Sequence, residues 1–225
     1  MAGWFTHLLV AQRVLEKLPP SKRSFLSGFA QLDDYLFGSI APDARYIPNV
    51  NANITHKPFG KESAFEAFDS KSPFVAGYET HLITDKNWDA IVNLFKIDAT
   101  NDSQKLALYF AVDRYLQLKS GWFLSLMFSG NVIRADNFKE ICSLGISKDD
   151  ISKFKSLVSS YLPATDAASF ISFMGRFPVL SEIFSRFNQE AIVNILDSAV
   201  IPKRELNGFL TKSVSDSAKA LAKNI

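Results

Sequence analysis

Cysteine is almost absent from this chain, which has a single one, Cys142, among its 225 residues. No disulfide bond can form within the chain, and this favours a reducing compartment. The first residues also lack the basic stretch, apolar run and small-residue cleavage site of a secretory signal. We therefore expect a cytoplasmic protein. With no histidine close to it in sequence, Cys142 is expected to be a buried packing residue rather than a nucleophile.

Long apolar runs and an excess of charge of one sign are missing as well. No run approaches the roughly 20 apolar residues that a membrane-spanning helix requires. The net charge of +2 gives no strong signal for a nucleic-acid or anionic-membrane partner. Phenylalanine, in contrast, is abundant: 20 phenylalanines and 47% hydrophobic residues indicate a large core or an apolar cleft.

Apolar residues recur at helical spacing along most of the chain, and no stretch alternates as a half-buried strand would. The first helix is expected from Trp4 to Leu18, where two prolines end it. Ser72 and Pro73 are expected as the N-cap and first residue of another helix, and Ser147 as the N-cap of a third. Further helices are expected over residues 25–37, 62–68, 104–118, 137–142, 148–161, 166–174, 179–198 and 202–223.

These patterns predict an all-α fold. We expect a helical core over residues 1–135 and a C-terminal helical extension over residues 136–225. The extension either stands apart from the core or belongs to the same domain.

All three histidines lie in the first 81 residues: His7, His56 and His81. Asp85 follows His81 by four residues, so both side chains share one face of the expected helix, with Cβ atoms about 5–6 Å apart. Gly77 lies one turn earlier and would admit another backbone or a ligand. A nitrogen and an oxygen donor at this spacing can share one divalent cation or bridge two.

Each of these residues has an ordinary interpretation when taken alone. His81 fits a hydrogen-bonded core histidine, and Asp85 a residue that orients it. Asp43, which follows a proline, fits a capping residue, and His56 fits an exposed loop histidine. The joint pattern favours a metal site, because buried histidine and aspartate are costly unless they are paired or metal-bound.

The pattern resembles the zinc-dependent phospholipase C family, whose members are all-α phosphodiesterases related to the S1/P1-type nucleases. The resemblance covers roughly residues 1–90. It is carried by His7 near the N-terminus, Gly38-Ser-Ile-Ala-Pro-Asp43, Thr55-His56 and Gly77-Tyr-Glu-Thr-His81-Leu-Ile-Thr-Asp85. It implies a multi-helix bundle of the phospholipase C/P1 nuclease type.

The resemblance also implies a set of ligands. Carried over by position, one zinc ion would be held by Asp43, His56, His81 and Asp85. Asp85 would bridge toward a second ion held by His7, and Asp43 would occupy the position of a base-acting carboxylate. Zinc fits this mixture of donors, and manganese or iron would fit it too.

Two departures from the family limit the expected site to one or two ions. Secreted members use the amine of an N-terminal tryptophan as a ligand, whereas Trp4 is internal here. They also have two further histidines and a glutamate beyond this helix, but no histidine follows His81. Asp113 and Asp89 are the candidate additional ligands. Asp113 is otherwise interpreted as a surface acid beside Arg114.

Two function classes remain open from these residues. The first is a metal-dependent phosphoester hydrolase that uses a metal-activated water and acts on a phosphoester small molecule or a phospholipid headgroup. The alternative is a non-catalytic metal-binding helical protein that acts through a protein partner. An open coordination position would favour the enzyme. A phosphohydrolase built on an adjacent His-Asp pair is disfavoured, because the chain has no such dipeptide.

Overall fold

Every element of the computed structural model is helical in the part of the chain that it describes, namely residues 2–26, 28–47, 50, 55–56, 72–92, 102–135, 138–142, 146–163, 169, 172 and 202–224. The α-helices are α1 Trp4–Lys17, α2 Pro20–Arg23, α3 Phe29–Gly38, α5 Pro73–Asp89, α6 Asp102–Ser120, α7 Trp122–Arg134, α8 Phe138–Cys142, α9 Lys148–Tyr161 and α13 Lys203–Asn224. One 3₁₀ helix, η1, spans Ala41–Tyr46. The predicted all-α class is therefore confirmed for these residues.

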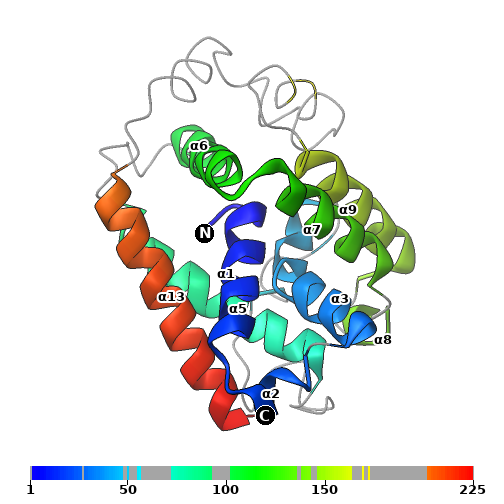
Figure 1. The fold of residues 1–225 in the computed structure, drawn as a ribbon. Helices are drawn as coiled ribbons and strands as arrows, with labels where there is room; N and C mark the ends of the chain where they lie inside the picture. Colours follow the sequence, from blue (N-terminus) through cyan, green and yellow to red (C-terminus); the bar gives the residue numbers. More distant parts are fainter. Residues whose placement is uncertain are drawn as a thin grey trace.

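Helix α1 lies in the middle of the bundle (Figure 1), where it contacts α3, α5, α6 and α13. Its first two turns are buried on every side, from Trp4 to Ala11. The helix ends at Lys17, directly before the two prolines, as the sequence predicts. A central helix with buried polar residues on its second turn places those residues inside the molecule rather than at its surface.

The C-terminal residues pack against the N-terminal ones. Helix α13 runs along α1 and α5, and α9 packs against α7 (Figure 1). Trp4 of α1 meets Phe154 and Tyr161 of α9 edge to face, with ring centroids 5.7 and 5.1 Å apart. Residues after position 135 thus pack directly against residues before it.

Several expected helix ends are borne out. Ser147 caps α9 and accepts a hydrogen bond from the Asp150 amide at 3.1 Å. Pro73 is the first residue of α5, and Ser72 is its N-cap, although the Ser72 side chain makes no capping bond. Gly38 is the last residue of α3.

Other expectations were wrong. The helix expected from residue 25 begins only at Phe29, because the chain turns first through the short α2. No helix was expected over Trp122–Arg134, where α7 lies. Its residues are too uniformly apolar to show a helical stripe, and its entry depends on Gly121, whose φ is +89°. Cys142 is exposed rather than buried.

The helices expected over residues 62–68 and 179–198 lie outside the described residues, and so does the helix expected over 166–174 except for residues 169 and 172. Among the helices that are described, none combines the length and apolar character needed to cross a membrane.

Candidate metal centre

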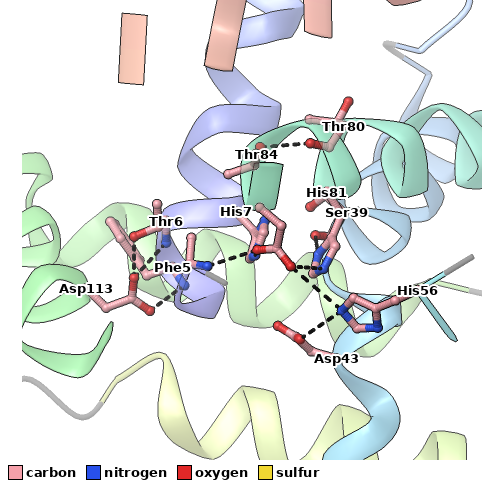
Figure 2. Close-up of polar contacts among 12 residues, drawn as sticks. Phe5, Thr6, His7, Ser39, Asp43, His56, Thr80, His81, Thr84 and Asp113 are labelled. Atoms are coloured by element: carbon pink, nitrogen blue, oxygen red, sulfur yellow. Dashed lines mark hydrogen bonds and ion pairs between the residues drawn. The ribbon is translucent and has the colours of Figure 1, made fainter. Parts of the chain in front are cut away.

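The structure brings together all five of the residues expected to hold metal, from four separate parts of the chain. His7 comes from the second turn of α1, Asp43 from η1, and His81 and Asp85 from α5. His56 follows the buried Thr55. Figure 2 shows His7, His81, His56 and Asp43 gathered at one place. A nitrogen of each imidazole lies 3.2 to 3.7 Å from an oxygen of Asp85. His7, His81 and Asp43 are buried, and His56 and Asp85 are slightly exposed.

Helix α5 supplies the middle of this His–Asp cluster. His81 and Asp85 lie one turn apart on one face, as predicted, with 3.4 Å between His81 Nε2 and Asp85 Oδ2. The other His81 ring nitrogen, Nδ1, donates to the Ser39 carbonyl at 2.9 Å. That bond fixes the ring, and it leaves the Nε2 lone pair directed at the cluster.

Two glycines make this bond possible. A Cβ on Gly77 would overlap the Tyr35 carbonyl oxygen of α3, and a Cβ on Gly38 would overlap the Phe74 carbonyl oxygen of α5. Without side chains at both positions, α3 and α5 approach backbone to backbone, and the Ser39 carbonyl reaches His81. Gly77 was expected to admit a close approach, and the approaching group is the backbone of α3.

His56 is held by α5 as well. The Tyr78 hydroxyl donates to the Thr55 carbonyl at 2.6 Å, and the Thr55 hydroxyl lies 3.1 Å from His56 Nδ1. His56 Nε2 therefore faces the cluster, 3.7 Å from Asp85 Oδ2 and 3.8 Å from Asp43 Oδ1. Two of the three imidazoles have their far nitrogen engaged by a neighbouring oxygen, which is the usual support for metal-binding histidines.

Asp85 is the residue that the three histidines share. Its Oδ2 faces His81 and His56, and its Oδ1 lies 3.2 Å from His7 Nε2. The same Oδ1 accepts a hydrogen bond from the Ala2 amide at 2.9 Å. The His7 and His81 rings stack with centroids 3.9 Å apart. Each oxygen of Asp85 therefore serves a different side of the cluster.

Five buried atoms of the cluster have no hydrogen-bond partner among the described residues. They are both ring nitrogens of His7, Nε2 of His56, Nε2 of His81 and Oδ1 of Asp43. Buried polar atoms are nearly always satisfied, since an unsatisfied one costs about 1–3 kcal/mol. Four of these atoms, namely Nε2 of each histidine and Oδ1 of Asp43, lie around Asp85 and one another, whereas His7 Nδ1 is on the other side of its ring. Such a group of buried donors indicates a binding site for one or two cations.

The protonation states suit ligands for a cation. Burial, together with the positive charges of His81 and Arg45, lowers the pKa of His56 to about 3. Burial opposes ionisation of Asp85, but His81 and His7 outweigh it and hold the Asp85 pKa well below its ordinary value. At neutral pH His56 is therefore a neutral imidazole and Asp85 a carboxylate, the forms that bind metal.

Asp43 differs from Asp85 in this respect. Burial raises the Asp43 pKa to about 6, although His81 and Arg45 act in the opposite direction. Arg45, which also lies in η1, places Nη2 3.5 Å from Asp43 Oδ1. Asp43 therefore exchanges its proton close to neutral pH.

The spacing of the donor atoms fits a transition-metal ion. Tetrahedral zinc with bonds of about 2.1 Å holds its donors roughly 3.4 Å apart. The contacts of His81 and His56 with Asp85, and of His56 with Asp43, span 3.4 to 3.8 Å. Two groups of three donors are compact enough to hold an ion. One is His7, His81 and Asp85, and the other is Asp43, His56 and His81. His81 has one lone pair for both, so it can serve only one ion, and a second ion would depend on His7 and Asp85.

The candidate additional ligands lie elsewhere. Asp113 is fully buried, not a surface acid, and its carboxylate binds the backbone of α1 rather than the cluster. It accepts hydrogen bonds from the Phe5 and Thr6 amides and from the Thr6 and Tyr161 hydroxyls. Asp89 is exposed at the end of α5 and belongs to neither donor group.

Sequence reasoning missed the groups that support the ligands. Ser39, Thr55 and Tyr78 lie within the quoted motifs, but the sequence assigned them no role, because a backbone carbonyl or a supporting hydroxyl leaves no signal of its own. Comparisons with protein-family models, curated proteins and solved structures found no match for this chain.

Proposed function

We propose that the His–Asp cluster binds one or two divalent metal ions, with zinc the best match, and that the protein is a metal-dependent phosphoester hydrolase. The observation that carries the proposal is the convergence of four buried atoms from four chain segments, Nε2 of the three histidines and Oδ1 of Asp43, which have no hydrogen-bond partner among the described residues. The resemblance of the motifs to zinc-dependent phospholipase C supports the same class of reaction.

Asp43, His56, His81 and Asp85 would hold the first ion, and His7 with Asp85 Oδ1 the second. A bound ion would lower the pKa of a water molecule toward neutrality and offset negative charge on the phosphoryl oxygens. Asp85 would orient both positions, because each of its oxygens faces different histidines.

Asp43 is the catalytic base in this proposal. Burial raises its pKa to about 6, near neutral pH, where a general base is most effective, and the carboxylate oxygen that does not hold the ion would receive the proton. The Arg45 guanidinium beside it would meet the negative oxygens of a phosphoester.

The exposure of the cluster favours an enzyme over a closed structural site. The side chains of His56 and Asp85 are 20% and 15% exposed, whereas His7 and His81 are fully buried. Solvent therefore reaches the cluster from the side of His56, where a coordination position would remain open for water or substrate.

The test is metal content per chain, measured by elemental mass spectrometry on tag-free protein, followed by hydrolysis of bis(4-nitrophenyl) phosphate. We expect the wild type to carry zinc or another transition metal, and His81→Ala/Asp85→Ala to carry none. Asp89→Ala is the matched control, because Asp89 is an exposed carboxylate on the same helix and should change neither readout. Asp43→Asn should lose hydrolysis.

Two results would contradict the proposal at different points. A wild type that neither contains nor takes up metal excludes the metal centre. A metal-loaded wild type that cleaves no phosphoester leaves the non-catalytic alternative, in which the metal-binding protein acts through a protein partner.

A further inference from the structure

A second polar hollow lies between α7 and α9 and shares no residue with the His–Asp cluster. Its volume is about 750 Å³. Of the described residues that line it, five are serines, two are cations and none is acidic. Small-molecule sites commonly have volumes of about 300–1,000 Å³ with a few converging polar groups.

The two cations differ in how firmly they are placed. Lys155 is only 9% exposed, its Nζ donates to the Ala135 carbonyl, and that nitrogen lies 5.0 Å from the centre of the Phe37 ring. Arg134 gives Nε and Nη2 to Asp33 at 3.0 and 3.2 Å. Asp33 thus offsets one of the two positive charges and holds the Arg134 guanidinium in place at the edge of the hollow.

Hydroxyl groups form the rest of the wall. Four serines of α9 recur at helical spacing and share one face of that helix: Ser152, Ser156, Ser159 and Ser160. The Ser159 hydroxyl oxygen is buried and has no hydrogen-bond partner among the described residues. Opposite it on α7, the Ser129 hydroxyl reaches the Ser159 carbonyl at 3.4 Å. The Ser152 and Ser160 hydroxyls donate to the Lys148 and Ser156 carbonyls of their own helix. The Lys155 ammonium, the Arg134 guanidinium and the Ser159 hydroxyl are the donors that this space offers to an anion with several oxygens.

We propose that this α7–α9 pocket binds a phosphate group. Lys155 supplies the buried charge, Arg134 a second cationic donor, and Ser159 a hydroxyl that a phosphate oxygen would satisfy. Phosphate offers more acceptor oxygens than a carboxylate and so matches a wall that carries both cations and hydroxyls. The pocket is separate from the metal centre, so this proposal does not depend on the hydrolase proposal.

The phosphate has two sources with the same chemistry, a soluble phosphoester and a phospholipid headgroup. Helix α7 carries exposed apolar side chains, among them Phe123 at 74% and Ile133 at 59% exposure, and of these two Ile133 lines the pocket. A lipid would bring these side chains against its acyl region, whereas a soluble ligand would leave them in water.

The first measurement is calorimetric titration of the full chain with inorganic phosphate and with glycerol phosphate at low ionic strength. Lys155→Met keeps the length of the side chain and removes its charge, and should weaken binding about tenfold. Lys153→Gln is the matched control: it removes a charge from the same helix, but Lys153 is exposed, pairs with Asp150 and does not line the pocket. Binding by Lys153→Gln should equal that of the wild type.

Further variants keep the test decisive. If Lys155→Met does not fold, Arg134→Gln and Ser159→Ala should each still weaken binding. The titration is repeated with His81→Ala/Asp85→Ala, since phosphate held at the metal centre would be lost there and phosphate in the α7–α9 pocket would not.

A second experiment distinguishes a soluble phosphoester from a phospholipid headgroup. It measures sedimentation of the protein with vesicles of phosphatidylcholine, either alone or mixed with phosphatidic acid. Binding to soluble phosphates that depends on Lys155 supports the soluble source. Binding only to phosphatidic acid vesicles, reduced by both Lys155→Met and Phe123→Ser, supports the lipid source. Absence of binding in both arms, or binding that Lys155→Met leaves unchanged, overturns the proposal.

Discussion

Two buried clusters that contain an aspartate carboxylate flank the first turns of α1, and they differ in how completely their polar atoms are hydrogen-bonded. Asp113 accepts bonds from the Phe5 and Thr6 amides and the Tyr161 hydroxyl at 2.8 to 2.9 Å, and from the Thr6 hydroxyl as well. The His–Asp cluster begins at the very next residue, His7, and five of its buried atoms have no hydrogen-bond partner within the part of the chain that the structure describes. The satisfied cluster fits a structural role, whereas the unsatisfied one fits a site that binds something else.

The two clusters are also joined. Asp113 accepts hydrogen bonds from the Phe5 and Thr6 amides. These two residues directly precede His7, whose ring faces Asp85. Tyr161 ties the same carboxylate to α9. The structural cluster thus sets the position of one candidate ligand without touching the candidate metal centre.

Removing the Asp113 carboxylate should have the largest effect on stability. Asp113→Ala leaves two backbone amides and two hydroxyls buried without an acceptor, and we expect it to lower the free energy of unfolding by about 4 kcal/mol. Urea denaturation followed by circular dichroism measures this. Asp89→Ala, at an exposed position, should change stability by less than about 0.5 kcal/mol. Equal stability of the two variants would contradict the structural role of Asp113.

The pH dependence of stability should separate this carboxylate from an ordinary one. Burial raises the Asp113 pKa to about 6, although its four donors act the other way. Its contribution is therefore fully present below the unfolded pKa near 3.8 and is lost as pH rises through about 6. Relative to Asp113→Asn, the wild type should lose about 3 kcal/mol between pH 4 and pH 7. A constant difference across this range would show that the four donors cancel the effect of burial.

Zinc should stabilise the folded protein by binding at the His–Asp cluster and not at the Asp113 carboxylate. At free zinc 100 times the Kd, the wild type should gain about 2.7 kcal/mol of stability, seen as a higher melting temperature. His56→Ala should lose most of this gain, since His56 Nε2 faces both Asp43 and Asp85. Lys86→Ala, exposed on α5, is the control. The same gain in His56→Ala would remove that residue from the site.

The smallest effect concerns one bond of the satisfied cluster. Tyr161→Phe keeps the ring contacts with Trp4 and Phe110 and removes only the hydroxyl that donates to Asp113. We expect a loss of about 1 kcal/mol. Ser152→Ala, which removes an exposed hydroxyl bonded within α9, should cost less than this. A loss as large as that of Asp113→Ala would mean that Tyr161 has a role beyond the single bond.

The sequence predicted the parts that depend on local rules. Prolines and capping residues located the ends of α1, α5 and α9, and the four-residue spacing placed His81 and Asp85 on one face. The association of His7, Asp43 and His56 with them followed from the family resemblance, because spacing alone does not join distant segments. Asp113 was interpreted wrongly as a surface acid, since its partners Phe5 and Thr6 lie more than 100 positions away in sequence. Helix α7 was missed because nearly all its faces are apolar.

The crossing of α3 and α5 has a consequence for the size of the ion that the proposed metal centre would take. Gly38 and Gly77 each receive a carbonyl of the opposite helix, so neither helix can slide along the other without a collision between backbones. Ser39, which orients His81, follows the end of one helix, and His81 with Asp85 lies on the other. A larger ion such as calcium, with bonds of about 2.3–2.6 Å and six to eight oxygen ligands, would require these donors to spread apart. Because Gly38 and Gly77 hold the two helices in close contact, the donors cannot easily spread, and this disfavours such ions.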